Sequence, residues 1–229
     1  MKYLKKPFSM TKITQSLIKA LNDMRMGEAC GTKIEYAYIG GNQATESSEV
    51  QKLGQYFEYL MTGAMPKHGG TPGPERLKNG QPAAAYVRAE KAAQLGLDAL
   101  QYHGFTVKQA GVLLENDIAA GTADIIAEKD GVQVIVDIKY SSHAFSDFRR
   151  WSWAPDAVAS NENYLLQAVH YSWLMGRAPF YFLVLDSSTG EDYRLLHVHL
   201  EEHHYAQHAL LVKGLYYDID SMRLNMPPQ

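Results

Sequence analysis

Two aspartates and one lysine in the segment AGTADIIAEKDGVQVIVDIKY carry the side chains best suited to chemistry. Asp130 and Gly131 predict a two-residue hairpin turn in the middle of this segment. Both positions of such a turn need positive φ, which Asp and Gly tolerate. In that hairpin Asp124 lies opposite Asp137, with Cβ atoms about 4.5 to 5.5 Å apart. Carboxylates at that distance repel each other, so the pair indicates a cation between them.

Lys139 lies on the same face of the expected strand as Asp137, because side chains alternate, while Val136 points to the core. Hydrolysis of a phosphodiester needs a metal ion that activates water, and a cation that positions the nucleophile. Asp124 and Asp137 offer hard oxygen ligands, and the carbonyl of Ile138 offers another. Lys139 can hold the water. The alternative is a solvated strand pair, because short D-x-K patterns are common.

Two expected helices place further polar side chains before and after the hairpin. The first runs from Ser48 to Thr62 and carries Glu58. The second runs from Tyr164 to Met175 and carries Gln167 and Tyr171 one turn apart, on one face. The alternatives are an ordinary helix aromatic for Tyr171, a surface polar residue for Gln167 and a solvated helix residue for Glu58.

Periodicity and turn signals predict the remaining elements of one α/β domain spanning residues 1–229. Ser48 and Gln51 predict a capping box, and four residues of that helix are expected to face the core: Val50, Leu53, Phe57 and Met61. Further helices are expected over residues 11–26, 82–102 and 201–222, and strands over 33–39, 105–115, 179–186 and 193–200. Residues 141–163 are expected to be irregular, and the Gly- and Pro-rich stretch 66–82 to be a flexible loop.

Composition limits the possible functions. A formal net charge of -3 excludes a general polyanion binder, so any nucleic-acid contact needs a local patch. Arg149, Arg150 and Trp151, together with Trp153, can form such a patch or be plain surface. Cys30 is the single cysteine, which excludes an internal disulfide and a four-thiolate cluster within the chain. No run of about 18 apolar residues occurs, so a soluble cytoplasmic protein is expected.

The stretch HVHLEEHHYAQH raises the question of a zinc site. His197 and His199 share a face of the expected strand, and His204 and His208 share a face of the expected helix. No single face gathers three of them. Solvated or capping histidines are therefore expected here.

Four motifs in order resemble those of the PD-(D/E)XK nuclease superfamily, in particular its RecB-like and phage lambda exonuclease branches. They are GTAD at residues 121–124, DIK at 137–139, Gln167-x-x-x-Tyr171, and Gly54-x-x-x-Glu58 before them. The opening FSMTKI is similar to the first helix of RecB-like domains. Asp137 stands where many members have Glu, which shortens the ligand but keeps its charge.

The resemblance implies a restriction-endonuclease-like core, with a central mixed β-sheet flanked by helices. It implies a metal-dependent DNA exonuclease of phage-type recombination or repair. A single-strand exonuclease, a structure-specific endonuclease, and a catalytically silent module that binds DNA or a partner are the alternatives. DNA is the expected partner, and the resemblance also allows a single-strand annealing or recombination protein and an oligomer.

The resemblance also assigns roles to residues. Glu58, Asp124 and Asp137, with the carbonyl of Ile138, would bind one or two Mg²⁺ ions, for which Mn²⁺ is expected to substitute. Lys139 would orient the attacking water. Gln167 and Tyr171 would position Lys139 or a backbone phosphate. Because Cys30 stands alone, the iron–sulfur cluster of some relatives is not expected.

Overall fold

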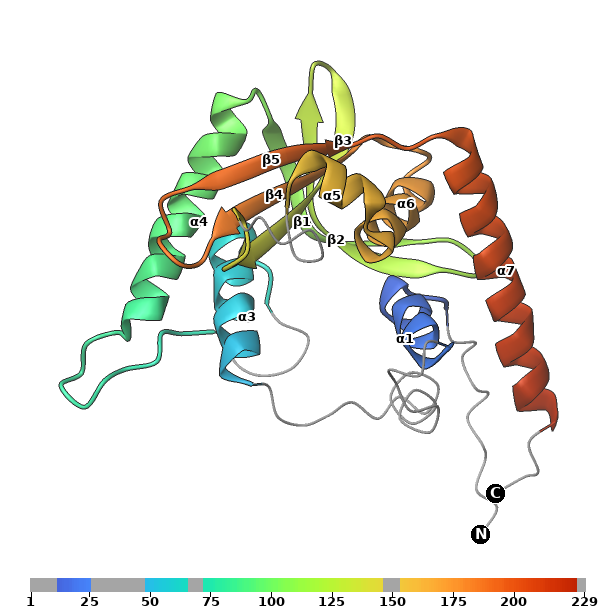
Figure 1. Ribbon diagram of the computed structural model, residues 1–229, viewed down its shortest axis with the longest axis horizontal. Helices are drawn as coiled ribbons and strands as arrows, with labels where there is room; N and C mark the ends of the chain where they lie inside the picture. Colours follow the sequence, from blue (N-terminus) through green and yellow to red (C-terminus); the bar gives the residue numbers. More distant parts are fainter. Residues whose placement is uncertain (1–11, 26–47, 66–71, 146–152, 226–229) are drawn as a thin grey trace, which may run out of the picture.

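The computed structural model describes residues 12–25, 48–65, 72–145 and 153–225. In these residues one mixed sheet has helices on both sides (Figure 1). The strand order is β1-β2-β3-β4-β5, in which β3 and β4 are parallel and the other neighbours are antiparallel. The strands are β1 (Thr106–Glu115), β2 (Ala120–Lys129), β3 (Val132–Ser141), β4 (Phe180–Asp186) and β5 (Tyr193–Val198). This confirms the predicted α/β class with a central mixed sheet.

Helices flank the sheet, and all of them except α5 were predicted from the sequence. They are α1 (Gln15–Arg25), α3 (Glu49–Thr62), α4 (Ala84–Tyr102), α5 (Pro155–Ser160), α6 (Glu162–Leu174) and α7 (Glu202–Asn225). Helix α3 begins with the predicted capping box, because Ser48 N–H donates to the Gln51 side chain at 2.8 Å and Gln51 N–H donates to the Ser48 hydroxyl at 3.3 Å. No helix of the described residues is long and apolar enough to cross a membrane.

The central hairpin has the predicted turn and register. Asp130 and Gly131 have φ values of 53° and 77°, which a two-residue hairpin turn requires. The ladder runs from the pair Lys129 and Val132 to the pair Ile125 and Val136. The register therefore brings the two aspartates to the open end of the hairpin.

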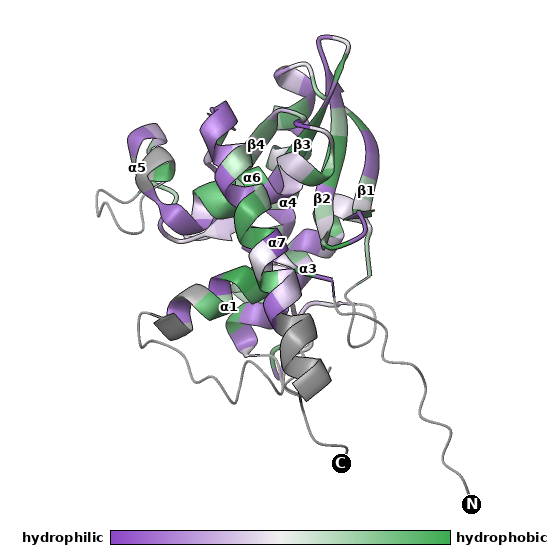
Figure 2. Cartoon of the chain, turned by 90° about the vertical axis from the view of Figure 1, so that its right-hand side faces the viewer, coloured by the Kyte–Doolittle hydropathy of each residue, from purple (hydrophilic) through white to green (hydrophobic). Residues whose placement is uncertain are grey.

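Different helices cover the two faces of the sheet. Helices α3 and α4 cover one face, where Phe57 and Leu100 pack against Val136 and Ile138. Helices α5 and α6 cover the other face, whose core includes Phe180 and Phe182 of β4, Trp153 and Ala168. Hydrophilic residues interrupt the hydrophobic surface of α6 (Figure 2). The face under α6 is therefore the one on which polar groups meet the sheet.

Helix α1 is anchored to both α6 and the start of β2. Leu17 and Ile18 are buried in a third cluster together with Val212 of α7. Just before α1, the N–H of Ile13 donates to the carbonyl of Ile118 at 2.9 Å, and the N–H of Ala120 donates to the carbonyl of Ile13 at 3.0 Å. These contacts fix α1 beside the strand that carries Asp124.

Some predictions about the elements were wrong. Val50 is 80% exposed instead of facing the core, because it lies in the first turn of α3, beyond the edge of the sheet cluster. Residues 155–160 form α5 instead of irregular chain, since Pro155 at its first position favours a helix start. The predicted strand over 33–39 lies outside the described residues, as does part of the predicted loop, residues 66–71.

Candidate functional site

The β2–β3 ladder ends at the pair Ile125 and Val136, so Asp124 and Asp137 are the next residues beyond it. The N–H of Ile135 donates to the carbonyl of Pro179 on the β4 side, so the N–H of Ile138 points toward β2. There it donates to Oδ2 of Asp124 at 2.9 Å. The Asp124 carboxylate thus replaces a backbone acceptor, and this holds it against the backbone of β3 next to Asp137.

Asp137 is the most buried carboxylate of the site, with 3% of its surface exposed. Its Oδ1 accepts a hydrogen bond from Nε2 of Gln167 at 2.6 Å. Its Oδ2 forms an ion pair with Nζ of Lys139 and has no further polar partner in the part of the chain that the structure describes. Strand β3 and helix α6 thus bring together three side chains that were predicted for the site.

Burial and like charge dominate the electrostatics of the two aspartates. The pKa of Asp124 is raised well above its usual value, first by burial and then by the charge of Asp137. Burial also raises the pKa of Asp137, although Lys139 and Gln167 oppose that rise. Burial alone would lower the pKa of Lys139, but Asp137 and Asp124 outweigh it, so its net pKa is raised. When both carboxylates are ionised, they therefore carry more negative charge than one lysine offsets.

Tyr171 packs on the glycine that opens the GTAD motif. A Cβ atom at Gly121 would lie 2.6 Å from Cε1 of Tyr171, so the ring rests directly on the backbone of β2. The pKa of Tyr171 is raised by burial and then by Asp137 and Asp124, which places its hydroxyl within their field. The phenol therefore stays protonated as a hydrogen-bond donor beside the carboxylates.

Glu58 of α3 approaches the same site from the opposite side. It is exposed, and its charge raises the pKa values of Asp124 and Tyr171. No three His, Cys, Asp or Glu side chains in the described ranges converge closely enough to hold one metal ion. Glu58 is thus near the aspartates but does not complete a closed set of three ligands with them in this conformation.

The donor set of Asp124 and Asp137 fits a hard divalent cation. Both side chains offer carboxylate oxygens, which Mg²⁺ and Mn²⁺ prefer, and Mg²⁺ usually binds through one or two carboxylates with water completing the shell. Among the described residues, the buried Oδ2 of Asp137 has only the Lys139 ammonium as a polar partner. A bound cation would remove the repulsion that raises the pKa of Asp124. The roles of Glu58 and of the Ile138 carbonyl as ligands stay predictions.

The nucleic-acid patch predicted around Arg149 and Trp153 is not seen in the described residues. Arg149, Arg150 and Trp151 lie outside the described residues. Trp153 does not lie on a nucleic-acid surface, because it is buried and stacks on Tyr164 with ring centroids 4.1 Å apart. Its large apolar ring fills the space between α5, α6 and β4.

One histidine of the C-terminal stretch is neither solvated nor capping. His204 is a capping residue, since its Nδ1 accepts the N–H of Glu201 at 2.9 Å. His208 is instead buried, and its Nε2 lies 3.1 Å from Nδ1 of His170. Nε2 of His170 lies 3.1 Å from the carbonyl of Ala120. His170 was not predicted for this region, although its position directly before Tyr171 in α6 offered a signal.

Comparisons with known proteins support the fold. No family model matches the sequence, and no curated protein matches it. The crystal structure of a "Putative exonuclease" from Eubacterium rectale is similar, with a TM-score of 0.63 and 15% sequence identity. The match covers 100% of this chain and 95% of that chain. A crystal structure of the protein SSO0001 matches over 99% of this chain and 83% of that chain at 12% identity, but its TM-score of 0.37 is too low to carry an argument. The chain therefore shares the fold of the Eubacterium rectale structure.

Proposed function

We propose that the protein is a metal-dependent DNA exonuclease that hydrolyses phosphodiester bonds at the open end of the β2–β3 hairpin. The observation that carries this proposal is the pair of crowded carboxylates, Asp124 and Asp137, with Lys139 against one of them. A module that only binds DNA has no need for uncompensated negative charge at this point. The similarity to a structure named as an exonuclease adds support from the fold.

A divalent cation bound here would supply a water of lowered pKa and would neutralise charge that develops on the phosphate. Asp124 and Asp137 would hold this ion, and the Asp124 carboxylate is already oriented by the N–H of Ile138. The raised pKa of Lys139 keeps its ammonium charged at neutral pH, so it can hold the attacking oxygen and the phosphate in place.

The two residues from α6 have supporting roles. Gln167 donates to Asp137 and so fixes the carboxylate that faces Lys139. Tyr171 remains a protonated phenol against Gly121, and it can donate to a phosphate oxygen. Both residues lie on one face of α6, whose position relative to β3 therefore sets the geometry of the site.

Incubation with DNA and Mg²⁺ tests the proposal. The substrates are end-labelled linear duplex and covalently closed circular duplex, and Asp124→Asn is the matched inactive variant. The proposal predicts that the wild type degrades the linear DNA, leaves the circles intact, and needs Mg²⁺ or Mn²⁺. No cleavage with either metal would refute a nuclease. Cleavage of the circles would instead support the alternative of a structure-specific endonuclease.

A further inference from the structure

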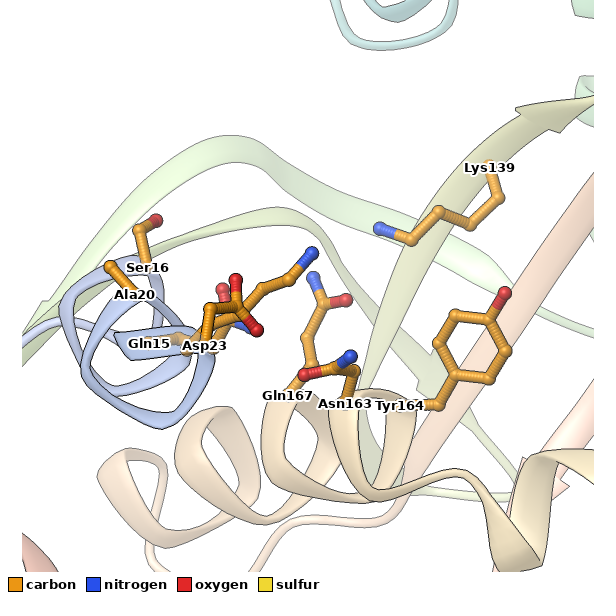
Figure 3. A pocket seen from close by; sticks show the side chains of 9 residues that line it. Gln15, Ser16, Ala20, Asp23, Lys139, Asn163, Tyr164 and Gln167 are labelled. Carbon is orange, nitrogen blue, oxygen red and sulfur yellow. The ribbon is translucent and has the colours of Figure 1, made fainter. Parts of the chain in front are cut away.

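A cavity of about 530 Å³ lies between α1 and the first turns of α6, beside the carboxylates. Residues from three elements border it: Lys19 and Asp23 of α1, Asn163, Tyr164 and Gln167 of α6, and Lys139 of β3. Figure 3 shows the side chains of Asp23, Gln167 and Lys139 pointing into this space. The cavity therefore shares Lys139 and Gln167 with the candidate active site.

We propose that this cavity binds one nucleotide of the DNA strand, the one next to the scissile phosphodiester, and that Lys19 binds the phosphate on the other side of that nucleotide, which is not cleaved. The position of the scissile bond rests on the function proposed above. The cavity volume lies within the range of roughly 300 to 1,000 Å³ that small-molecule sites occupy. Its polar lining suits a ligand that is both charged and rich in hydrogen-bonding groups.

The two lysines of the cavity differ in whether their charge is paired with a carboxylate. Lys139 is paired with Asp137, so much of its charge is already offset. Lys19 is exposed and forms no ion pair within the ranges that the structure describes. An ammonium on a flexible stem is a common phosphate ligand. Lys19 is therefore the cation of the cavity that is available to an incoming phosphate.

The α6 wall offers groups for the rest of a nucleotide. Tyr164 stacks on the buried Trp153 with planes 22° apart, which holds its ring in one orientation. A rigid aromatic side chain beside phosphate-binding cations suits packing against a base or a sugar. Asn163 is exposed at the same wall, and its amide can both donate and accept hydrogen bonds.

Asp23 has the opposite charge to Lys19, so substitutions at the two residues should change phosphate binding in opposite directions. It follows Lys19 by four residues, so it lies on the same face of α1 and borders the same cavity. Its carboxylate repels a phosphate that Lys19 attracts. Helix α1 itself is fixed by its buried residues Leu17 and Ile18, so neither substitution at the exposed face removes core packing.

Calorimetric titration with mononucleotides tests the proposal on the full chain in EDTA, which excludes binding through a metal. The ligands are a deoxynucleoside 5′-monophosphate, the matching 3′-monophosphate, the unphosphorylated nucleoside and inorganic phosphate. One of the monophosphates is expected to bind more tightly than both the nucleoside and inorganic phosphate. The preferred monophosphate shows on which side of the scissile bond the cavity lies.

Substitutions then locate the binding. Lys19→Gln is expected to weaken the preferred monophosphate about tenfold, which is the range for one hydrogen bond to a charged group. Asp23→Asn is expected to tighten it. Lys213→Gln is the matched control, because Lys213 is an exposed lysine of α7 that does not border the cavity. Ser16→Trp, at an exposed position of the cavity wall, is expected to block binding by filling the space.

The outcomes of these experiments distinguish failure of the cavity assignment from failure of the proposed nuclease activity. In cleavage assays Lys19→Gln should raise KM while leaving kcat nearly unchanged, because Lys19 binds the strand and does not contact the reacting atoms. Active cleavage with no mononucleotide binding, or binding that Lys19→Gln and Asp23→Asn leave unchanged, would overturn the cavity assignment and leave the nuclease standing. Inorganic phosphate that binds as tightly as the nucleotide would also overturn it. Mononucleotide binding by a protein that never cleaves DNA would support the cavity and refute the nuclease.

Discussion

Two clusters of buried and half-buried polar side chains contact helix α6, and they differ in charge. The acidic cluster consists of Asp124, Asp137 and Lys139, and the histidine pair consists of His170 and His208. In the acidic cluster burial raises the pKa of Asp124 and the second carboxylate raises it further. In the histidine pair burial lowers both pKa values, that of His208 to about 3.

The histidine pair can satisfy its contacts without any charge. The carbonyl of Ala120 can only accept, so Nε2 of His170 must donate to it, at 3.1 Å. Nδ1 of the neutral His170 is then an acceptor, and Nε2 of His208 donates to it at 3.1 Å. This assignment leaves Nδ1 of His208 as a buried acceptor without a partner among the described residues.

The difference distinguishes a structural contact from a candidate site. The histidine pair is neutral and connects α7 and α6 to Ala120, four residues before Asp124. The acidic cluster has two carboxylates and one ammonium, so it has one negative charge in excess when both carboxylates are ionised. A buried charge in excess is costly unless another ion offsets it. The comparison therefore predicts that the acidic cluster depends on a cation and the histidine pair does not.

The largest expected effect is on cleavage. Asp137→Asn removes a ligand charge while keeping the shape and the contact with Gln167, so Mg²⁺-dependent cleavage of linear DNA should fall by at least about a hundredfold. Asp186→Asn is the matched control, because Asp186 is also buried but only accepts hydrogen bonds from Ser188 and Thr189. Asp137→Asn that cleaves at nearly the wild-type rate would contradict the site.

Lys139→Met separates catalysis from binding. Methionine keeps the length of the side chain but not its charge, so turnover should fall by about a hundredfold or more while affinity for DNA in Ca²⁺ largely survives. Lys139→Arg should also be poor, because a guanidinium is larger and forked. Turnover of labelled DNA and fluorescence anisotropy measure the two quantities. A Met variant that keeps turnover and loses affinity would make Lys139 a phosphate contact only.

Loss of the histidine pair should affect stability before activity. His170→Phe removes the donor to the Ala120 carbonyl and to the network with His208, which should lower the free energy of unfolding by about 1 to 3 kcal/mol. Urea denaturation measures this change. His199→Phe is the control on the neighbouring surface, because His199 is exposed and its side chain makes no hydrogen bond within the described residues. An unchanged unfolding free energy for His170→Phe would contradict a structural role for the pair.

A smaller effect is expected on the pH dependence of stability: burial of neutral His208 should make the protein less stable as the pH falls. The folded pKa of His208 is lowered to about 3 from the usual 6.5, so the unfolded state binds the proton first as the pH falls. The stability that neutral His208 provides is present above pH 6.5 and is lost as the pH falls toward 3. The slope is at most about 1.4 kcal/mol per pH unit. His208→Phe should flatten this part of the urea-denaturation profile, and a profile that falls as steeply as the wild type would contradict the account.

The sequence predicted the acidic cluster better than its surroundings. Local rules were enough for the turn at Asp130 and Gly131 and for the register down to Ile125, because a two-residue hairpin fixes both. They could not show that the ladder ends there, since the Asp124 side chain takes the N–H of Ile138. That contact depends on how β2 diverges from β3, which is a property of the whole sheet.

Contacts between elements far apart in the sequence could not be predicted from local sequence patterns. His170 and His208 are 38 residues apart, and their pairing depends on how α7 packs against α6. The burial of Trp153 depends on a cluster shared by α5, α6 and β4. The cavity beside Lys139 exists only because α1 docks on α6, and the sequence pattern of α1 indicates a helix but not its partner.

Calorimetric titration of Mg²⁺ or Mn²⁺ into the metal-free protein tests the central claim most directly. The wild type is expected to bind at least one ion and to be stabilised in thermal unfolding, because the ion offsets the excess charge of Asp124 and Asp137. Asp137→Asn is expected to lose this binding, whereas His208→Phe is expected to keep it. A wild type that binds neither ion, or an Asp137→Asn variant that binds as tightly as the wild type, would contradict a cation-dependent acidic cluster.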